Sequence, residues 1–215
     1  MGEMKLPGAI ALSLMSTADY AQLGGIAQLA ARYQAGDPSL TDEEVAYFLE
    51  NSALLTEDVI AKLSLPSLPY NLDAWDGYTT EREKVLDIFQ TASKDLVVLA
   101  GDTHNAWASD LKATDGNFVG LEFATSSVSS PGLEYYLGIT DEAANNTEAG
   151  LVSLVEGLKY VNATNRGFLT VTFTQDEAQS EWHFVDTILS KEYSSLSERQ
   201  TKATTAINNP GVILS

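Results

Sequence analysis

The stretch Leu96-Val97-Val98-Leu99-Ala100-Gly101-Asp102-Thr103-His104 decides the fold of this chain. Its first five residues are apolar at every position, which is typical of a strand covered on both faces within a parallel sheet, although so short an apolar run also suits a buried helix. The residues before it place Val85, Leu86 and Phe89 on one helical face. A helix, a buried strand and a glycine-led loop in this order predict an α/β fold.

Two polar side chains, Asp102 and His104, follow this strand in the loop that begins at Gly101. Ligands of open α/β sheets bind just beyond the carboxyl ends of the strands, so this loop is a candidate site. A carboxylate oxygen suits a hard cation and an imidazole nitrogen suits a transition metal, and an extended loop lets the pair reach two neighbouring metal positions. The alternative is a histidine that only forms a hydrogen bond at a strand end. A catalytic metal takes about three protein ligands, so one pair does not complete a centre.

Capping signals and apolar periodicity predict four helices before the strand. Two of them begin with a capping box, in which a threonine is followed three residues later by a glutamate. The predicted helices cover residues 17–33, 42–52, 56–63 and 80–92, with the boxes at Thr41 and Glu44 and at Thr80 and Glu83.

The segment after the loop is richer in strands. Residues 118–124 are strand-like and residues 126–132 form a turn of small residues. Residues 169–173 alternate between apolar side chains and threonine, which predicts a strand with one solvated face, and its hairpin partner begins at Trp182. Residues 191–215 are polar and rich in serine and threonine, so we expect a peripheral tail there.

Composition narrows the function classes. The formal net charge of -18 repels nucleic-acid phosphates and anionic lipid surfaces, which argues against a nucleic-acid or membrane-surface role. The need for solubility alone also explains so large an excess of acidic residues. No cysteine is present, so the sequence offers neither a disulfide framework nor a thiolate metal site. No apolar run approaches the roughly 20 residues of a membrane span, and the start of the sequence lacks the pattern of a signal peptide.

Several segments together resemble the PhoD-like alkaline phosphatases, a family of metallophosphoesterases. The stretch from Val98 to His104, with Trp107 and Asp110, resembles the C-terminal metal-binding motif of that family. Further similar segments occur in the family's order, namely Asn71-Leu72-Asp73-Ala74-Trp75-Asp76-Gly77-Tyr78 with Arg82, Glu122-Phe123, and Ser126 to Gly132. The resemblance extends from about Met1 to Val185.

The resemblance implies an α/β sandwich of the metallophosphoesterase type, with helices before a mixed sheet and a C-terminal β-hairpin. It implies an iron and a calcium ion, with His104 as an iron ligand and Asp102 as a ligand of the second metal. The implied reaction is hydrolysis of phosphate mono- or diesters by a metal-bound hydroxide, and the implied location is periplasmic or extracellular. Because the net charge repels a phosphate ester, such an activity needs the metal cations to reverse the local field.

The family's N-terminal ligands have no counterpart in this sequence. We therefore expect residues 1–190 to be the C-terminal portion of a catalytic domain, partnered by the missing N-terminal half or by self-association. One alternative is a catalytically incomplete fragment or subunit that complements another polypeptide. Another is a carbohydrate- or protein-binding β domain that uses the threonine-rich strands and Trp182.

Four further residues are candidates for contact with substrate or for support of the metal ligands. Asp76 and Tyr78 line the substrate cleft in one interpretation; in the other, Asp76 pairs with Arg82 while Trp75 and Tyr78 pack beneath the turn. Asn105 and Trp107 follow the metal pair, and we expect Trp107 to support the loop by packing rather than to contact substrate. His183 lies in a predicted strand far along the chain and is not expected to be a ligand.

Overall fold

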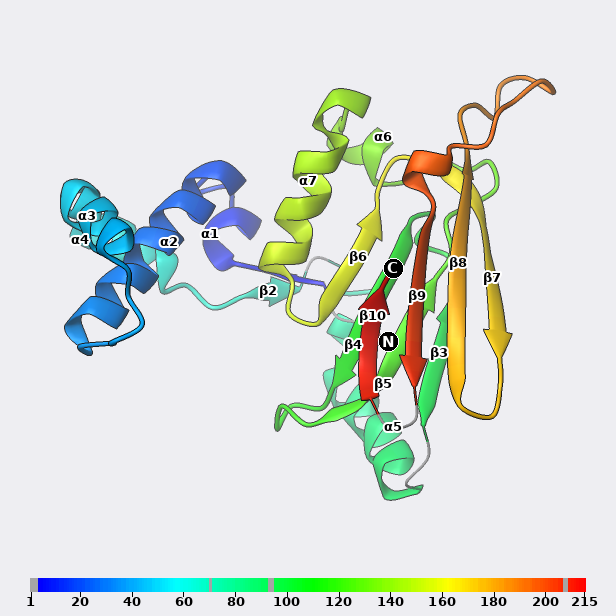
Figure 1. Cartoon of the computed structure of the whole chain (residues 1–215), viewed down its shortest axis with the longest axis horizontal. Helices are drawn as coiled ribbons and strands as arrows, with labels where there is room; N and C mark the ends of the chain where they lie inside the picture. The colour runs from blue at the N-terminus through cyan, green and yellow to red at the C-terminus, as the bar shows by residue number, and fades with distance from the viewer. Residues whose placement is uncertain (1–3, 70, 93–94, 207–208) are drawn as a thin grey trace. The chain divides into compact units, whose positions relative to one another are not determined.

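The computed structural model describes residues 4–69, 71–92, 95–206 and 209–215. These residues form two compact units, which are described separately. One unit comprises residues 5–70 and is mostly helical, and the other comprises Met4 and residues 71–215 and contains both four-stranded sheets (Figure 1). The sequence predicts residues 1–190 as the C-terminal portion of a catalytic domain, and the chain passes from one compact unit to the other at residue 70.

The helical unit follows its capping signals. Helix α2 begins after Ser16, whose hydroxyl accepts a hydrogen bond from the Asp19 amide at 3.1 Å, and it buries Ile26. The predicted helices over residues 17–33 and 56–63 are therefore confirmed. The elements of this unit are β1 (Lys5–Leu6), α1 (Gly8–Ala11), α2 (Thr17–Gln34), α3 (Asp42–Asn51), η1 (Ser52–Leu54), α4 (Glu57–Leu63) and β2 (Leu68–Pro69), with β1 and β2 antiparallel.

The predicted capping box at the start of α3 is present. The Thr41 hydroxyl accepts from the Glu44 amide at 3.1 Å, and the Glu44 carboxylate accepts from the Thr41 amide at 2.8 Å. Arg32 of α2 donates to the same carboxylate at 3.0 Å. The Thr41 amide and then Arg32 stabilise the ionised form, which lowers the pKa of Glu44. The box therefore joins two helices as well as beginning one.

Replacing Thr41 with alanine is expected to weaken the first turn of α3 by about 1 kcal/mol, because the Glu44 amide loses its acceptor. Amide hydrogen exchange of residues 42–45 measures the effect. Thr41→Ser keeps the hydroxyl and should exchange at nearly the wild-type rate. Equal protection in the alanine and serine variants would show that the cap contributes nothing to this helix.

The second unit is built from two facing sheets. One sheet has the strand order β3-β5-β4-β6, in which β3 and β5 are parallel and the other pairs are antiparallel. The other sheet has the order β10-β9-β8-β7 and is antiparallel throughout. The elements are η2 (Trp75–Gly77), α5 (Thr79–Ala92), β3 (Leu96–Ala100), β4 (Ala106–Lys112), β5 (Phe118–Ala124), α6 (Leu133–Leu137), α7 (Asp141–Leu154), β6 (Leu158–Asn162), β7 (Arg166–Phe173), β8 (Glu177–Val185), η3 (Ser197–Arg199), β9 (Thr201–Ala206) and β10 (Asn209–Leu214).

The core between the sheets is centred on Trp182. This side chain is fully buried, its ring contacts Phe123 edge-to-face at a centroid distance of 5.7 Å, and its indole N–H donates to the Ala124 carbonyl at 2.8 Å. The ring of Tyr160 also contacts Trp182, at a centroid distance of 5.1 Å. Burial raises the pKa of the Tyr160 hydroxyl to about 12. A second apolar cluster joins Leu86 of α5 to the other face of the mixed sheet. The predicted α/β class, with a mixed sheet and a C-terminal hairpin, is confirmed.

Strand β3 differs from its prediction in one respect. It forms at Leu96–Ala100 and pairs in parallel with β5, as its apolar run predicts. However, β3 is an edge strand of its sheet in the described part of the chain, and the side chain of Leu99 is 54% exposed. One edge of this strand and the side chain of Leu99 are therefore open in the described part of the chain.

The segment predicted as a peripheral tail, residues 191–215, contains two strands. Strand β9 pairs with β8 over its whole length, and Ala203 is fully buried in the core between the sheets. Strand β10 then completes the antiparallel sheet. The prediction overlooked these strands because threonine was read as a sign of a loop, although its branched side chain suits a strand.

The second predicted capping box does not form. Helix α5 begins at Thr79, so Thr80 lies inside the helix and is not its cap. The Glu83 carboxylate instead accepts from the Thr114 amide at 2.8 Å and pairs with Arg82 at 2.9 Å.

Within the described residues, no helix has both the length and the apolar character that a membrane crossing requires.

Candidate metal loop

The loop between β3 and β4 carries the two predicted metal ligands on unusual backbone. Asp102 has a φ of 70° and His104 a φ of 63°, so both occupy the left-handed region. Aspartate and histidine enter this region more readily than most residues, yet each such conformation costs on the order of 1–3 kcal/mol. Strain of this kind is often found at functional sites, and here two such residues lie in one loop.

The His104 ring is held by one of its nitrogens. Its Nδ1 lies 2.8 Å from the carbonyl oxygen of Pro131, which can only accept a hydrogen bond. Nδ1 therefore carries the proton, and Nε2 keeps a lone pair that is available to a metal. The His104 carbonyl accepts from the Ser127 amide at 3.3 Å. The side chain and the backbone of His104 are therefore both hydrogen-bonded to the loop between β5 and α6.

Asp102 is exposed, and its carboxylate has no hydrogen-bond partner among the described residues. Both oxygens are therefore available to an external cation. Across the described residues, no group of three or more histidine, cysteine, aspartate or glutamate side chains is placed to hold a metal. Asp102 and His104 are therefore the two candidate ligands that this loop presents.

Asn105 and Trp107 fix the far end of the same loop. Asn105 is fully buried; its Nδ2 donates to the Ala163 carbonyl at 2.8 Å and its Oδ1 accepts from the Leu133 amide at 3.1 Å. Trp107 donates from its indole nitrogen to the Thr103 hydroxyl at 3.1 Å. These contacts place both residues as supports of the loop within the protein.

The other two candidates lie on a separate turn before α5. Asp76 is buried and accepts from the Met4 amide at 2.9 Å, and Gly77 leaves no room for a side chain because a Cβ would lie 1.8 Å from the Leu72 carbonyl oxygen. Trp75 is 36% exposed and Tyr78 is 54% exposed, so the expected packing of these rings beneath the turn is wrong. The predicted pairing of Asp76 with Arg82 stays a prediction.

The candidate residues lie within the part of the chain that matches a known protein family. The family model described as PhoD-like phosphatase matches residues 26–182, which include every candidate residue named above. The chain belongs to the PhoD-like phosphatase family. The predicted family is therefore confirmed.

Two similar proteins agree with this assignment. The alkaline phosphatase D of Bacillus subtilis (strain 168) is 38% identical over 68 residues, which cover 29% of this chain and 12% of that protein. A solved structure described as that of PhoD matches with a TM-score of 0.53 at 19% identity, covering 70% of this chain and 28% of that one. The chain therefore shares the fold of part of that structure. This PhoD-like chain spans less than a third of the length of either relative.

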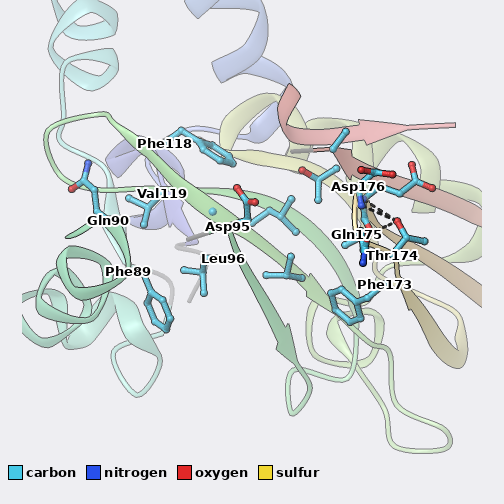
Figure 2. A pocket seen from close by; sticks show the side chains of 17 residues that line it. Phe89, Gln90, Asp95, Leu96, Phe118, Val119, Phe173, Thr174, Gln175 and Asp176 are labelled. Carbon is cyan, nitrogen blue, oxygen red and sulfur yellow. Dashed lines mark hydrogen bonds between the residues drawn. The ribbon is translucent and has the colours of Figure 1, made fainter. Parts of the chain in front are cut away.

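A cleft in this PhoD-like chain lies away from the metal loop. It has a volume of about 540 Å³ and is lined at the start of β3 and by the turn between β7 and β8 (Figure 2). Leu96, Phe118 and Phe173 form apolar walls, and Asp95 and Asp176 lie at its polar part. Ligands of α/β sheets bind at the carboxyl ends of the strands, and this cleft is at the opposite end of β3 from Asp102 and His104. We therefore place the site at the metal loop.

Three residues near the loop were not predicted as site residues from the sequence, and of these Pro131 contacts the loop. Pro131 supplies the carbonyl that holds His104, and Glu134 and Arg166 form an ion pair beside it. The turn of small residues that contains Pro131 was visible in the sequence. Nothing in the sequence relates Glu134 to Arg166, because they are 32 residues apart and meet only in the folded protein.

Proposed function

We propose that this chain contributes two metal ligands to the active site of a PhoD-like phosphoester hydrolase. The observation that carries the proposal is the Nδ1 contact of His104 with Pro131, which leaves Nε2 as a metal donor on the same loop as the unpaired carboxylate of Asp102. Family membership supports the reaction class. The short span of the chain relative to its relatives makes the activity a property of a more complete protein.

The donor set fits a pair of different cations. The imidazole of His104 suits iron, and the carboxylate of Asp102 suits a harder ion such as calcium, which are the metals that the family resemblance implies. When bound, the cations neutralise charge on the phosphoryl oxygens and activate a water molecule. They also reverse the field of a chain whose net charge is -18 and which would otherwise repel the substrate.

The residues around the pair keep it in place for this role. Pro131 fixes the His104 ring, Asn105 anchors the end of the loop in the interior, and Trp107 holds its middle through Thr103. A loop fixed in this way does not have to be ordered when cations and substrate bind, which lowers the entropic cost of binding.

By resemblance to the PhoD-like phosphatases, we propose that the parent enzyme is located in the periplasm or outside the cell.

A second candidate function is that of a catalytically incomplete subunit that complements another polypeptide. The absence of a third metal-ligating side chain near the pair, within the described residues, favours it. The carbohydrate-binding alternative is weakened by the structure, because Trp182, the aromatic residue on which it relied, is fully buried and unavailable to a ligand.

The test is an assay of the 215-residue chain with p-nitrophenyl phosphate, in the presence of added iron and calcium. We expect no appreciable turnover, because two ligands do not hold a two-metal centre. A more complete PhoD-like enzyme that includes this segment serves as the positive control. Turnover by the chain alone at ordinary enzyme rates, abolished by His104→Ala, would show that further ligands lie within these residues.

A further inference from the structure

One peptide group connects His104 to an ion pair outside the metal loop. Its carbonyl half, from Pro131, accepts the hydrogen bond from His104 Nδ1 at 2.8 Å. Its N–H half, from Gly132, points at the carboxylate of Glu134, with distances of 3.1 and 3.2 Å from the nitrogen to the two oxygens. His104 and Glu134 therefore bind opposite ends of the same peptide dipole.

Glu134 is itself held by a cation. Its Oε1 accepts from Nη2 of Arg166, the first residue of β7, and these two side chains are 21% and 9% exposed. Arg166 is fixed in turn, because its Nη1 donates to the Thr164 carbonyl at 3.2 Å. The low exposure limits screening by water, so the ion pair holds the Glu134 carboxylate against the Gly132 amide.

The same peptide group cannot easily rotate. A Cβ on residue 132 would lie 2.5 Å from Nδ2 of Asn105, so the backbone of Gly132 sits directly against a fully buried side chain. Asn105 also accepts from the amide of Leu133, the next residue along. The peptide is thus held between Asn105 on one side and Glu134 on the other.

We propose that Glu134, held by Arg166, is a positioning residue for His104 and acts through the peptide group between Pro131 and Gly132. A carboxylate that binds the N–H of a peptide polarises its carbonyl, and hydrogen bonds in such a chain strengthen one another. The stronger acceptor at Pro131 fixes the proton of His104 on Nδ1 and directs the Nε2 lone pair outward. The proposal rests on the proposed function for its purpose, because it explains how the ligand is prepared for a metal.

The tautomer of His104 tests this without any metal. The chain contains only two histidines, so a long-range ¹H–¹⁵N spectrum shows two imidazole rings, and His183→Gln identifies the signals of His104. All variants are measured at one fixed, mildly alkaline pH, so that the spectra differ only through the substitutions. In the parent chain, His104 is expected to show the Nδ1–H tautomer alone.

In Glu134→Ala, the spectrum of His104 is expected to lose the pure Nδ1–H pattern and to show the averaged tautomers of free imidazole. Glu134→Gln keeps an acceptor for the Gly132 amide but loses the charge, so its spectrum should lie between the two. Glu142→Gln removes an equally negative but exposed side chain elsewhere and should change nothing. Arg166→Lys retains a cation and should preserve more of the Nδ1–H form than Arg166→Met.

The outcomes separate this inference from the proposed function. An unchanged His104 tautomer in both Glu134 variants, with a folded amide spectrum, overturns the positioning role whatever the activity assay shows. A lost tautomer in Glu134→Ala, with an intermediate Glu134→Gln, supports it even if Asp102 and His104 prove unnecessary for phosphatase activity. If Glu134→Ala fails to fold, the glutamine variant decides, because its size and its acceptor are retained.

Discussion

In a more complete PhoD-like enzyme that carries this segment, His104→Ala and Asp102→Ala are each expected to lower kcat/KM by more than about 100-fold. Removal of residues that merely orient a metal ligand already costs roughly 10–100-fold, and loss of a ligand removes the donor itself. The measurement is steady-state hydrolysis of p-nitrophenyl phosphate, together with the metal content of each purified variant. We expect both variants to bind less metal than the parent enzyme.

The matched controls are His183→Ala and Tyr78→Phe. His183 lies on β8, where its ring stacks on Phe168 at a centroid distance of 4.9 Å, so its loss removes a histidine without touching the metal loop. Tyr78 is exposed on a separate turn, and its hydroxyl can at most contact substrate. A loss for Tyr78→Phe as large as that for His104→Ala would place Tyr78 in the chemistry.

Local signals predicted much of this structure. The apolar run at residues 96–100 and the polar loop after it are contiguous in the chain, so β3 and the positions of Asp102 and His104 could be inferred without tertiary information. The capping box at Thr41 is local in the same sense, since all of its atoms belong to four consecutive residues. Such local signals hold where no distant contact competes with them, whereas the box expected at Thr80 and Glu83 does not form and the Glu83 carboxylate binds the Thr114 amide.

The support of the site could not be predicted in this way. His104 depends on a carbonyl 27 residues away, and Glu134 depends on a cation 32 residues further along. Pairs of this kind are set by how β5, β7 and the turn around Pro131 come together. A single sequence carries no pattern that relates them.

The layering of the sheets was missed for a related reason. An apolar run predicts a strand but shows neither how many strands lie beside it nor how far its faces are covered, and within the described residues β3 is an edge strand with Leu99 exposed. Strand β9 is rich in threonine, and its buried residue is an alanine, Ala203. This small side chain belongs to the same core cluster as the large side chains of Trp182 and Phe184. Trp182 and Phe184 of β8 are the large buried side chains of this sheet, so the partner strand β9 needs no apolar pattern of its own.

The open edge of β3 leads to the second large expected effect, which is association of the 215-residue chain. Within the described residues β3 has a neighbour on one side only, so a row of its backbone N–H and C=O groups is available to another strand. Leu99 on β3 is 54% exposed, and Phe173 at the edge of the facing sheet is 58% exposed. Unpaired strand edges with apolar side chains drive association.

We therefore expect the chain produced alone to form dimers or larger assemblies, despite its net charge of -18. Light scattering at several concentrations measures the mass, and Leu99→Lys is expected to shift it toward the monomer, because a lysine on an edge strand opposes pairing. Leu189→Lys is the matched control: it makes the same change in charge at a side chain that is 94% exposed and lies outside the strands, and it should leave the mass unchanged. A monomer at every concentration, with cooperative unfolding, would show that the edge of β3 is stable without a partner and that the second unit is self-sufficient.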